Sequence, residues 1–120
     1  MCTAPVGSIL GRRVLVTGAS GGVGRFAVQL AAAGGAEVIA TTGDVAQRDG
    51  SHALGAHHVL GSPGELTEPV SAVLDMVGGR QLVSAHGRLA RGGMLVAIGH
   101  AAREAEVFDL RRLLRRRTRP

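Results

Sequence analysis

Glycines recur every three residues in the segment from Gly18 to Gly24, which reads Gly-Ala-Ser-Gly-Gly-Val-Gly. Gly18 can form a tight turn, Gly21 and Gly22 let the backbone approach a pyrophosphate, and Gly24 lets a helix pack closely. The amides of Ser20–Val23 would then point at the phosphates, aided by the helix dipole. A turn without a ligand is the alternative, but it needs one glycine rather than four. The segment therefore predicts a dinucleotide site made by Gly18, Ser20, Gly21, Gly22, Val23 and Gly24.

The type of nucleotide depends on the end of the second predicted strand, residues 37–41. An NAD site usually has an acidic residue there, about 20 residues beyond the glycine turn. Glu37 begins this strand, at the wrong end of the sheet, whereas Thr41 and Thr42 occupy its tip. A 2′-phosphate meets no repulsion from threonine, so we expect NADP(H) rather than NAD(H), with Arg48 as the phosphate contact.

Two features leave this preference open. Asp44 would repel a phosphate if it pointed inward, although Asp44 and Gln47 together form a capping-box-like helix start, which is the role we favour. Arg48 is equally well explained as a solvated charge on a helix face, and Gln47 could reach the phosphate in its place.

Apolar strands and helical segments alternate along the chain, and their order predicts the fold. Val23, Ala27, Leu30 and Ala31 share one predicted helix face, and Gly34-Gly35 ends that helix. Continuously apolar strands with helices between them indicate a parallel sheet covered on both faces, so we expect a Rossmann-type doubly wound α/β fold of five strands in the order 3-2-1-4-5. Ligands bind such sheets outside the carboxyl ends of strands 1 and 4. The predicted strands are residues 13–17, 37–41, 58–60, 72–75 and, after a Gly92-Gly93 turn, 94–98; the later helices are residues 44–54 and 80–90, and residues 61–69 are a loop.

Composition excludes several classes of protein. The 120 residues allow one domain, and all 14 cationic side chains are arginine, so a P-loop and any lysine Schiff base are excluded. One cysteine excludes a disulfide scaffold, and His57-His58 lacks a third ligand at metal spacing, so no zinc is expected. No apolar run approaches the roughly 20 residues of a membrane helix, and Met1–Leu10 does not resemble a signal peptide. We expect a soluble, cytoplasmic protein.

The chain also resembles a known family. Residues 11–31, with the glycine turn at their centre, are similar to the cofactor-binding domain of the medium-chain dehydrogenases/reductases, the zinc-binding dehydrogenase superfamily, in its quinone oxidoreductase-like branch. The similarity continues in order through residues 35–41, 54–59, 73–79 and 92–99. Members of the family start with a separate catalytic domain and continue past this C-terminus, so we expect a cofactor domain truncated at both ends.

The resemblance implies further cofactor contacts. Asp75, Val77 and Gly78 would line the crevice, and Gly99 would hold the nicotinamide end through its backbone, with His100 beside it. For Asp75, capping of the next turn is an equal alternative. Because the groups that touch substrate come largely from the missing domain, we assign no catalytic residue to this chain.

Two other classes share the glycine turn. Short-chain dehydrogenases need a catalytic tyrosine and lysine, and this chain has neither, so that class is excluded. Methyltransferases usually end the second strand with an acid for the ribose hydroxyls, where this chain has Thr41.

We therefore expect an irregular lead over residues 1–10, a Rossmann domain over 11–100 and a basic tail over 101–120 that forms a short helix. The expected function is hydride transfer from NADPH to a quinone or enone, by a domain that is not competent alone. The alternative is a non-catalytic module that senses NADPH or pairs with a separate subunit. An uncovered sheet edge would favour self-association. The arginine-rich tail could contact nucleic acid, but aromatic residues for stacking are absent and no nucleic acid partner is expected.

Overall fold

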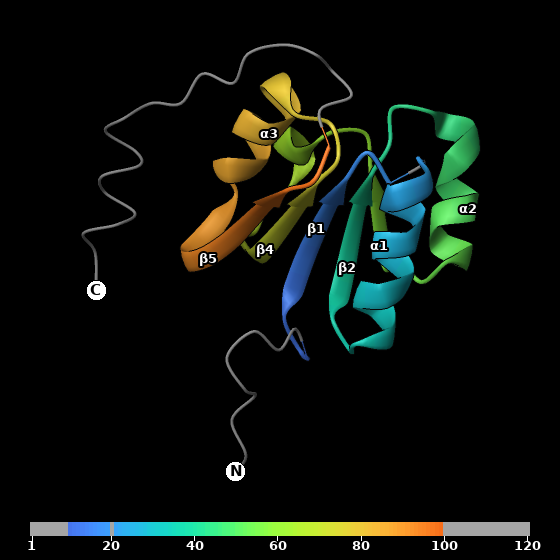
Figure 1. Ribbon diagram of the computed structural model, residues 1–120, viewed down its shortest axis with the longest axis horizontal. Coiled ribbons are helices and arrows are strands. Elements are labelled where there is room, and N and C mark those ends of the chain that lie inside the picture. The colour runs from blue at the N-terminus through green and yellow to red at the C-terminus, as the bar shows by residue number, and fades with distance from the viewer. Residues whose placement is uncertain (1–9, 20, 100–120) are drawn as a thin grey trace.

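The computed structural model describes residues 10–19 and 21–99, in which a twisted parallel sheet carries helices on both faces (Figure 1). The sheet has five strands in the order β3-β2-β1-β4-β5. This order confirms the predicted Rossmann-type fold. The strands are β1 (Arg13–Thr17), β2 (Glu37–Thr41), β3 (His58–Leu60), β4 (Val70–Asp75) and β5 (Leu89–Ala97).

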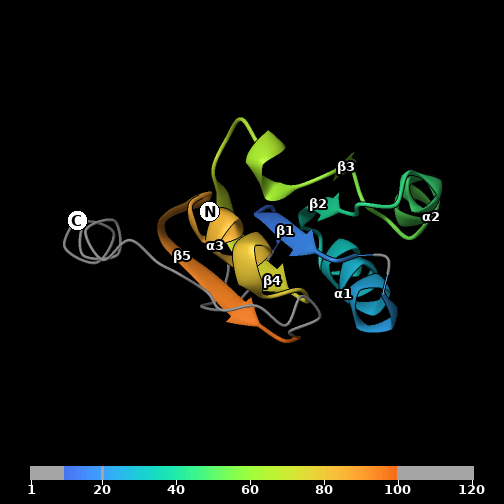
Figure 2. The ribbon, with the colours of Figure 1, turned by 90° about the horizontal axis from the view of Figure 1, so that it is seen from above.

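Helices connect most of these strands. Seen from above, α1 and α2 lie on one side of the sheet and α3 lies on the other (Figure 2). This division follows from right-handed crossovers that run in opposite directions from β1. The helices are α1 (Gly22–Ala33), α2 (Arg48–Ala53) and α3 (Gly79–His86), with single 3-10 turns at Val45–Gln47 and Pro63–Glu65.

Two apolar layers hold the helices to the sheet. Alternate residues of a strand point to opposite faces, so Val14 and Val16 pack under α1 whereas Leu15 packs on the α3 side. All three are fully buried, as expected for strands covered on both faces. The core consists of aliphatic side chains and one methionine, in a chain that has no tryptophan and no tyrosine.

The predicted inner face of α1 is partly wrong. Ala27 and Ala31 are buried, but Val23 and Leu30 are 59% and 56% exposed. The helix is rotated so that Gly24 faces the glycine turn, which brings Val28 inward one turn later. Its end is confirmed: Gly34 caps the helix and Gly35 has a φ of +87°.

The boundaries around β5 also differ from the prediction. The helix expected over residues 80–90 ends at His86, because Gly87 caps it and Leu89 already pairs with Val70. Gly92-Gly93 was predicted as a turn before the strand, but both glycines lie within β5, where the register with β4 shifts. This shift is a β-bulge, in which Gly92 adopts a turn-like φ of +76° while the strand continues.

Three predictions fall outside the described residues. These are the irregular lead predicted over residues 1–10, except its last residue, the site residue Ser20, and the helical tail with His100.

Candidate cofactor site

The glycine turn joins the end of β1 to the start of α1. Gly18 has a φ of +66°, which favours glycine, and a Cβ atom there would lie 2.7 Å from the Val77 side chain. Gly24 packs still more tightly, because a Cβ atom would overlap the Gly18 carbonyl oxygen and lie 2.9 Å from Ala19 Cα. Gly18 and Gly24 are therefore required by the fold itself.

Gly21 and Gly22 differ from these two. Among the described residues, a Cβ atom on Gly22 would meet nothing within 4 Å, and one on Gly21 would make only an ordinary contact at 3.7 Å. The protein's own packing does not require glycine at these positions. Both glycines lie where α1 begins, and among the described residues no side chain caps its first amides. The space is therefore open to a ligand that accepts hydrogen bonds from backbone amides.

The opposite wall of the site follows β4. Val77 and Gly78 leave β4 just beyond Asp75, and Gly78 has a φ of +75° where it leads into α3. Gly99 follows β5, its amide donates to the Asp75 carbonyl oxygen, and a Cβ atom on it would lie 2.6 Å from the Met76 carbonyl oxygen. The carboxyl ends of β1, β4 and β5 thus meet, as expected for the reversal point of the strand order.

Two cavities open on either side of Gly18 and Val77. The larger, of about 410 Å³, lies between the start of α1 and the end of β5. The smaller, of about 200 Å³, lies between the ends of β2, β3 and the start of α3. The two cavities share Gly18 and Val77 and lie along the carboxyl edge of the sheet, and we refer to them together as the crevice. The larger is lined by Gly18, Gly21, Val23, Gly24, Met76, Val77, Ile98 and Gly99, and the smaller by Gly18, Thr41, Thr42, Gly43, Gly61, Val77 and Gln81.

A buried hydrogen-bond network lies beneath this crevice. The Thr17 hydroxyl donates to the Asp75 carboxylate, and the Gly78 amide donates to its second oxygen at 2.6 Å. Asp75 is fully buried and lines neither cavity, so its carboxylate holds the β4–α3 turn in place. Two roles were considered for Asp75, and the observed geometry is that of a side chain that caps the turn after β4.

Thr41 and Thr42 end β2 at the wall of the smaller cavity. The Thr42 hydroxyl accepts from the Asp44 amide at 3.2 Å, and the Asp44 carboxylate accepts from the Ala46 amide at 3.0 Å. Asp44 thus caps the 3-10 turn, as we favoured. Glu37 lies at the opposite end of β2, where it pairs with Arg13 and His58.

Arg48 begins α2 beside the smaller cavity. A Cβ atom on Gly61, which lines that cavity, would lie 3.3 Å from Arg48 Nη2. The buried Arg48 Nε has no hydrogen-bond acceptor among the described residues. A buried donor without an acceptor costs roughly 1–3 kcal/mol. The Glu65 carboxylate also lies beside Gly61, with Oε2 2.6 Å from the same Cβ position.

Several residues that line the two cavities were not among the predicted site residues. They are Met76, Ile98, Gln81, Gly43 and Gly61. Gln81 is a polar residue in the first turn of α3, and nothing in its sequence neighbourhood distinguishes it from a surface glutamine. Met76 directly follows the predicted strand 72–75 and Ile98 ends the predicted strand 94–98, so both lie at the carboxyl edge where a ligand is expected.

The described histidines have structural partners. His57 Nδ1 accepts from the Val38 amide at 3.0 Å, and His58 Nε2 lies 3.0 Å from Glu37. Within residues 10–19 and 21–99, no three histidine, cysteine or acidic side chains gather as a metal site would require. In the same part of the chain, no helix is long and apolar enough to span a bilayer.

Comparison with known proteins matches the family model described as zinc-binding dehydrogenase to residues 22–119. A curated relative, the putative quinone oxidoreductase YhfP of Bacillus subtilis, is 35% identical over 94 residues, which are 72% of this chain and 28% of YhfP. This chain therefore spans less than a third of that relative.

Solved structures agree with this match. A thermostable alcohol dehydrogenase from Pyrobaculum aerophilum superposes with a TM-score of 0.78 at 34% identity, over 92% of this chain and 34% of that one. The YhdH oxidoreductase from Salmonella enterica in complex with NADP gives a TM-score of 0.80 at 30% identity, over 91% and 36%. The chain thus corresponds to about a third of each.

Proposed function

Because the chain belongs to the zinc-binding dehydrogenase family and forms an NAD(P)-binding domain of the oxidoreductase type, we propose that it binds NADPH for reduction of a quinone or enone. The observation that carries this proposal is the open space at Gly21 and Gly22. Packing explains the glycines at positions 18 and 24, whereas a ligand explains the other two.

The crevice fits a dinucleotide as follows. The amides at the start of α1, including those of Gly22 and Val23, hold the pyrophosphate, together with Ser20 of the glycine turn. The adenosine half occupies the smaller cavity, beside Thr41 and Thr42. The nicotinamide half occupies the larger cavity, between Val77 and Gly99.

The preference for NADPH rests on the end of β2. Thr41 and Thr42 carry no charge, and the Asp44 carboxylate is engaged by the Ala46 amide. The 2′-phosphate then lies near Arg48, whose Nε lacks an acceptor among the described residues. The Salmonella relative in complex with NADP supports this assignment by analogy.

The bound dinucleotide supplies a hydride from its nicotinamide ring. The side chains of Val23, Val77 and Ile98 form an apolar wall there. No residue of this chain is assigned to proton transfer, because none of the cavity residues is a side-chain acid or base. We propose that groups from another part of the enzyme supply it, and that no zinc takes part.

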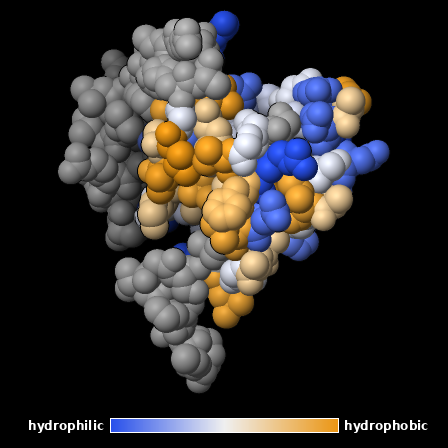
Figure 3. Space-filling model, turned by 45° about the vertical axis from the view of Figure 1, so that its right-hand side comes forward, coloured by the Kyte–Doolittle hydropathy of each residue, from blue (hydrophilic) through white to orange (hydrophobic). Residues whose placement is uncertain are grey.

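An exposed apolar surface indicates where that other part sits. Met94 and Val96 pair with Ala72 and Leu74, which face the α1 side of the sheet, but none of the helices within residues 10–19 and 21–99 covers Met94 and Val96 there. Figure 3 shows apolar side chains gathered in one area beside α1. This α1–β5 apolar surface meets the larger cavity at Val23 and Ile98. It consists of Val23, Phe26, Leu30, Met94, Val96 and Ile98, all exposed by more than a third.

We propose that the α1–β5 apolar surface receives a substrate-binding domain. Exposed apolar areas of this kind mark interfaces, and the solved relatives are about three times as long as this chain. The contact would close the larger cavity from one side. The domain could belong to the same polypeptide or to a separate subunit.

A paired assay tests the proposal. The fluorescence of NADPH and NADH is titrated with the purified chain, and the oxidation of NADPH by quinone and enone acceptors is then followed. We expect saturable NADPH binding, weaker NADH binding and negligible turnover. Robust turnover by these residues alone would contradict the need for a second domain, and absence of binding would contradict the site. Metal analysis of the active enzyme tests the absence of zinc.

A further inference from the structure

The connection between β3 and β4 is unusually brief. It comprises residues 61–69 and passes from the sheet edge over β2 and β1 to reach β4. Parallel strands usually need a crossover of about a dozen residues or more, with an α-helix in it. Here it contains only the 3-10 turn Pro63–Glu65. The α3 side of β2 and β3 is therefore covered by a loop rather than by a helix, as Figure 2 shows.

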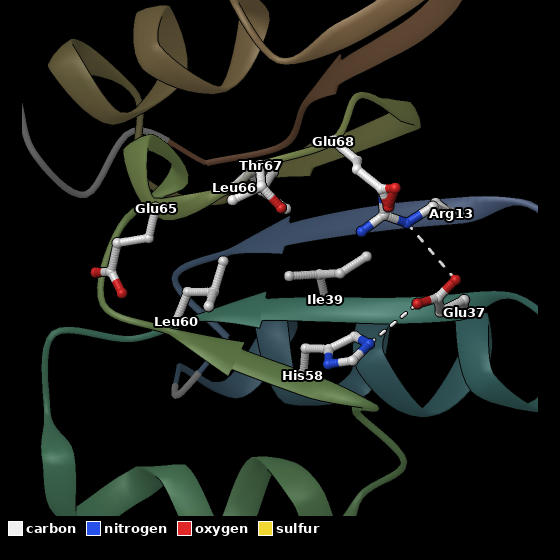
Figure 4. Close-up of a pocket in the computed structure, with 9 residues that line it drawn as sticks. All are labelled: Arg13, Glu37, Ile39, His58, Leu60, Glu65, Leu66, Thr67 and Glu68. Atoms are coloured by element: carbon white, nitrogen blue, oxygen red, sulfur yellow. Dashed lines mark hydrogen bonds and ion pairs between the residues drawn. The ribbon is translucent and has the colours of Figure 1, made fainter.

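A groove of about 270 Å³ lies where that helix would pack. Figure 4 shows its residues: Ile39 of β2 and Leu60 of β3 form the floor, and Leu66 of the connection faces them. The three side chains join the apolar cluster on the α3 side of the sheet. Ile39 is fully buried and Leu66 is 6% exposed, so the half-buried Leu60 supplies most of the open apolar surface of the floor.

The rim of this groove is acidic. Glu37 and Glu68 lie at one end and Glu65 at the other, and Arg13 stands between the first two (Figure 4). Arg13 Nε is 3.5 Å from Glu37, and its Nη1 is 3.5 Å from Glu68. Arg13 thus pairs with two of the three carboxylates, whereas Glu65 accepts from the Ser62 amide. The Glu68 side chain is 70% exposed and can pair with a further cation.

We propose that this groove receives the arginine- and leucine-rich segment of the same chain, residues 110–119. That segment contains six arginines, no acidic residue, and leucines at positions 110, 113 and 114. Its leucines match the apolar floor, and its arginines match the carboxylates of the rim. The segment would take the place of the missing crossover helix.

The chain is long enough for this contact. Between Gly99, after β5, and Leu110 there are residues 100–109, which extend to at most about 33 Å. Strands in a sheet are about 4.8 Å apart, so β5 and β3, at opposite edges of this sheet, are separated by roughly 19 Å. The remaining length suffices to pass the layer of α3. This proposal does not depend on the bound nucleotide.

Chemical cross-linking of the full chain tests it. In a Cys2→Ser background, Thr67→Cys places a thiol in the groove and Thr118→Cys places one in the segment, and neither changes a charge. A short bis-maleimide should link the two within one chain. The matched control combines Thr118→Cys with Ala33→Cys, at an exposed position of α1 on the opposite face. In this control the two thiols should be linked at least about tenfold more slowly, because they are not held close together.

Charge reversal gives an independent readout of the same assay. Glu68→Lys should slow the linking about fivefold, because it replaces an attraction by a repulsion, whereas Asp49→Lys on α2 should change it by less than about twofold. Circular dichroism verifies that each variant is folded. Equal linking in the Ala33 control, linking only between two chains, or no effect of Glu68→Lys would each overturn the proposal.

Discussion

The Thr17 hydroxyl, at the end of β1, donates a hydrogen bond to the buried carboxylate of Asp75, at the end of β4. The same hydroxyl accepts from the Met76 amide at 3.3 Å, and Asp75 accepts from the Gly78 amide at 2.6 Å. The two strands that flank the reversal point are thereby tied together at the floor of the crevice. Because Met76 and Gly78 are both hydrogen-bonded in this network, it holds Val77 between them in place.

Breaking the network should lower stability. Thr17→Val keeps the side-chain volume but leaves one buried carboxylate oxygen without its donor, and we expect a loss of about 1–3 kcal/mol in the free energy of unfolding. Urea titration followed by circular dichroism measures it. Ser84→Ala, a hydroxyl removal at a half-buried position of α3, should cost less. Equal losses in both variants would contradict the role assigned to Thr17.

Gly24→Ala should destabilise the fold. The added methyl group would overlap the Gly18 carbonyl oxygen and crowd Ala19 Cα, and both are backbone atoms that cannot rotate away. We expect a loss of about 1–3 kcal/mol, measured by thermal unfolding. Gly50→Ala in α2, where the nearest atom would be 3.9 Å away, is the matched control and should be neutral or stabilising.

Arg48→Gln should weaken NADPH binding selectively. The variant removes the charge beside the smaller cavity, so NADPH affinity should fall by about tenfold or more while NADH affinity stays nearly constant. Competition titrations with both nucleotides measure the ratio. Arg12→Gln removes the same charge at the amino end of the sheet and should leave the ratio unchanged. An unchanged ratio in Arg48→Gln would instead assign Arg48 to the solvated surface.

The isolated chain should associate with itself at high concentration. β5 is an edge strand of the sheet, and Met94 and Val96 on it are 54% and 38% exposed. Val96→Lys should shift sizing chromatography toward the monomer, because a lysine on an edge strand opposes pairing. Val45→Lys, at a 71% exposed position beside α2, should not. A monomer at all concentrations in the unmodified chain would contradict this expectation.

Much of the fold follows from local sequence. β1, β2 and β3 have the predicted bounds, and the Gly34-Gly35 pair ends α1, because each signal is contained in a few neighbouring residues. Tertiary contacts decide the rest. The rotation of α1 depends on Gly24 meeting Gly18, and the start of β5 depends on Leu89 pairing with Val70.

The candidate site was predictable to a similar extent. The glycine turn and the strand ends at Thr41 and Val77 border the crevice, because strand order places them there. Gln81 was not predictable, since it reaches the crevice only through the orientation of α3. The position of Asp75 below the crevice depends on its pairing with Thr17, which is distant in the sequence.

Calorimetric titration of NADPH into the unmodified chain and into Gly22→Ala tests the central claim most directly. The added methyl group meets no atom of residues 10–19 and 21–99 within 4 Å, so the unfolding curve should stay the same or improve slightly. It would occupy the space assigned to the pyrophosphate, so NADPH affinity should fall by about tenfold or more. Saturable binding that weakens in this way is the predicted result. No binding to the unmodified chain, or equal affinity in both, would contradict the account.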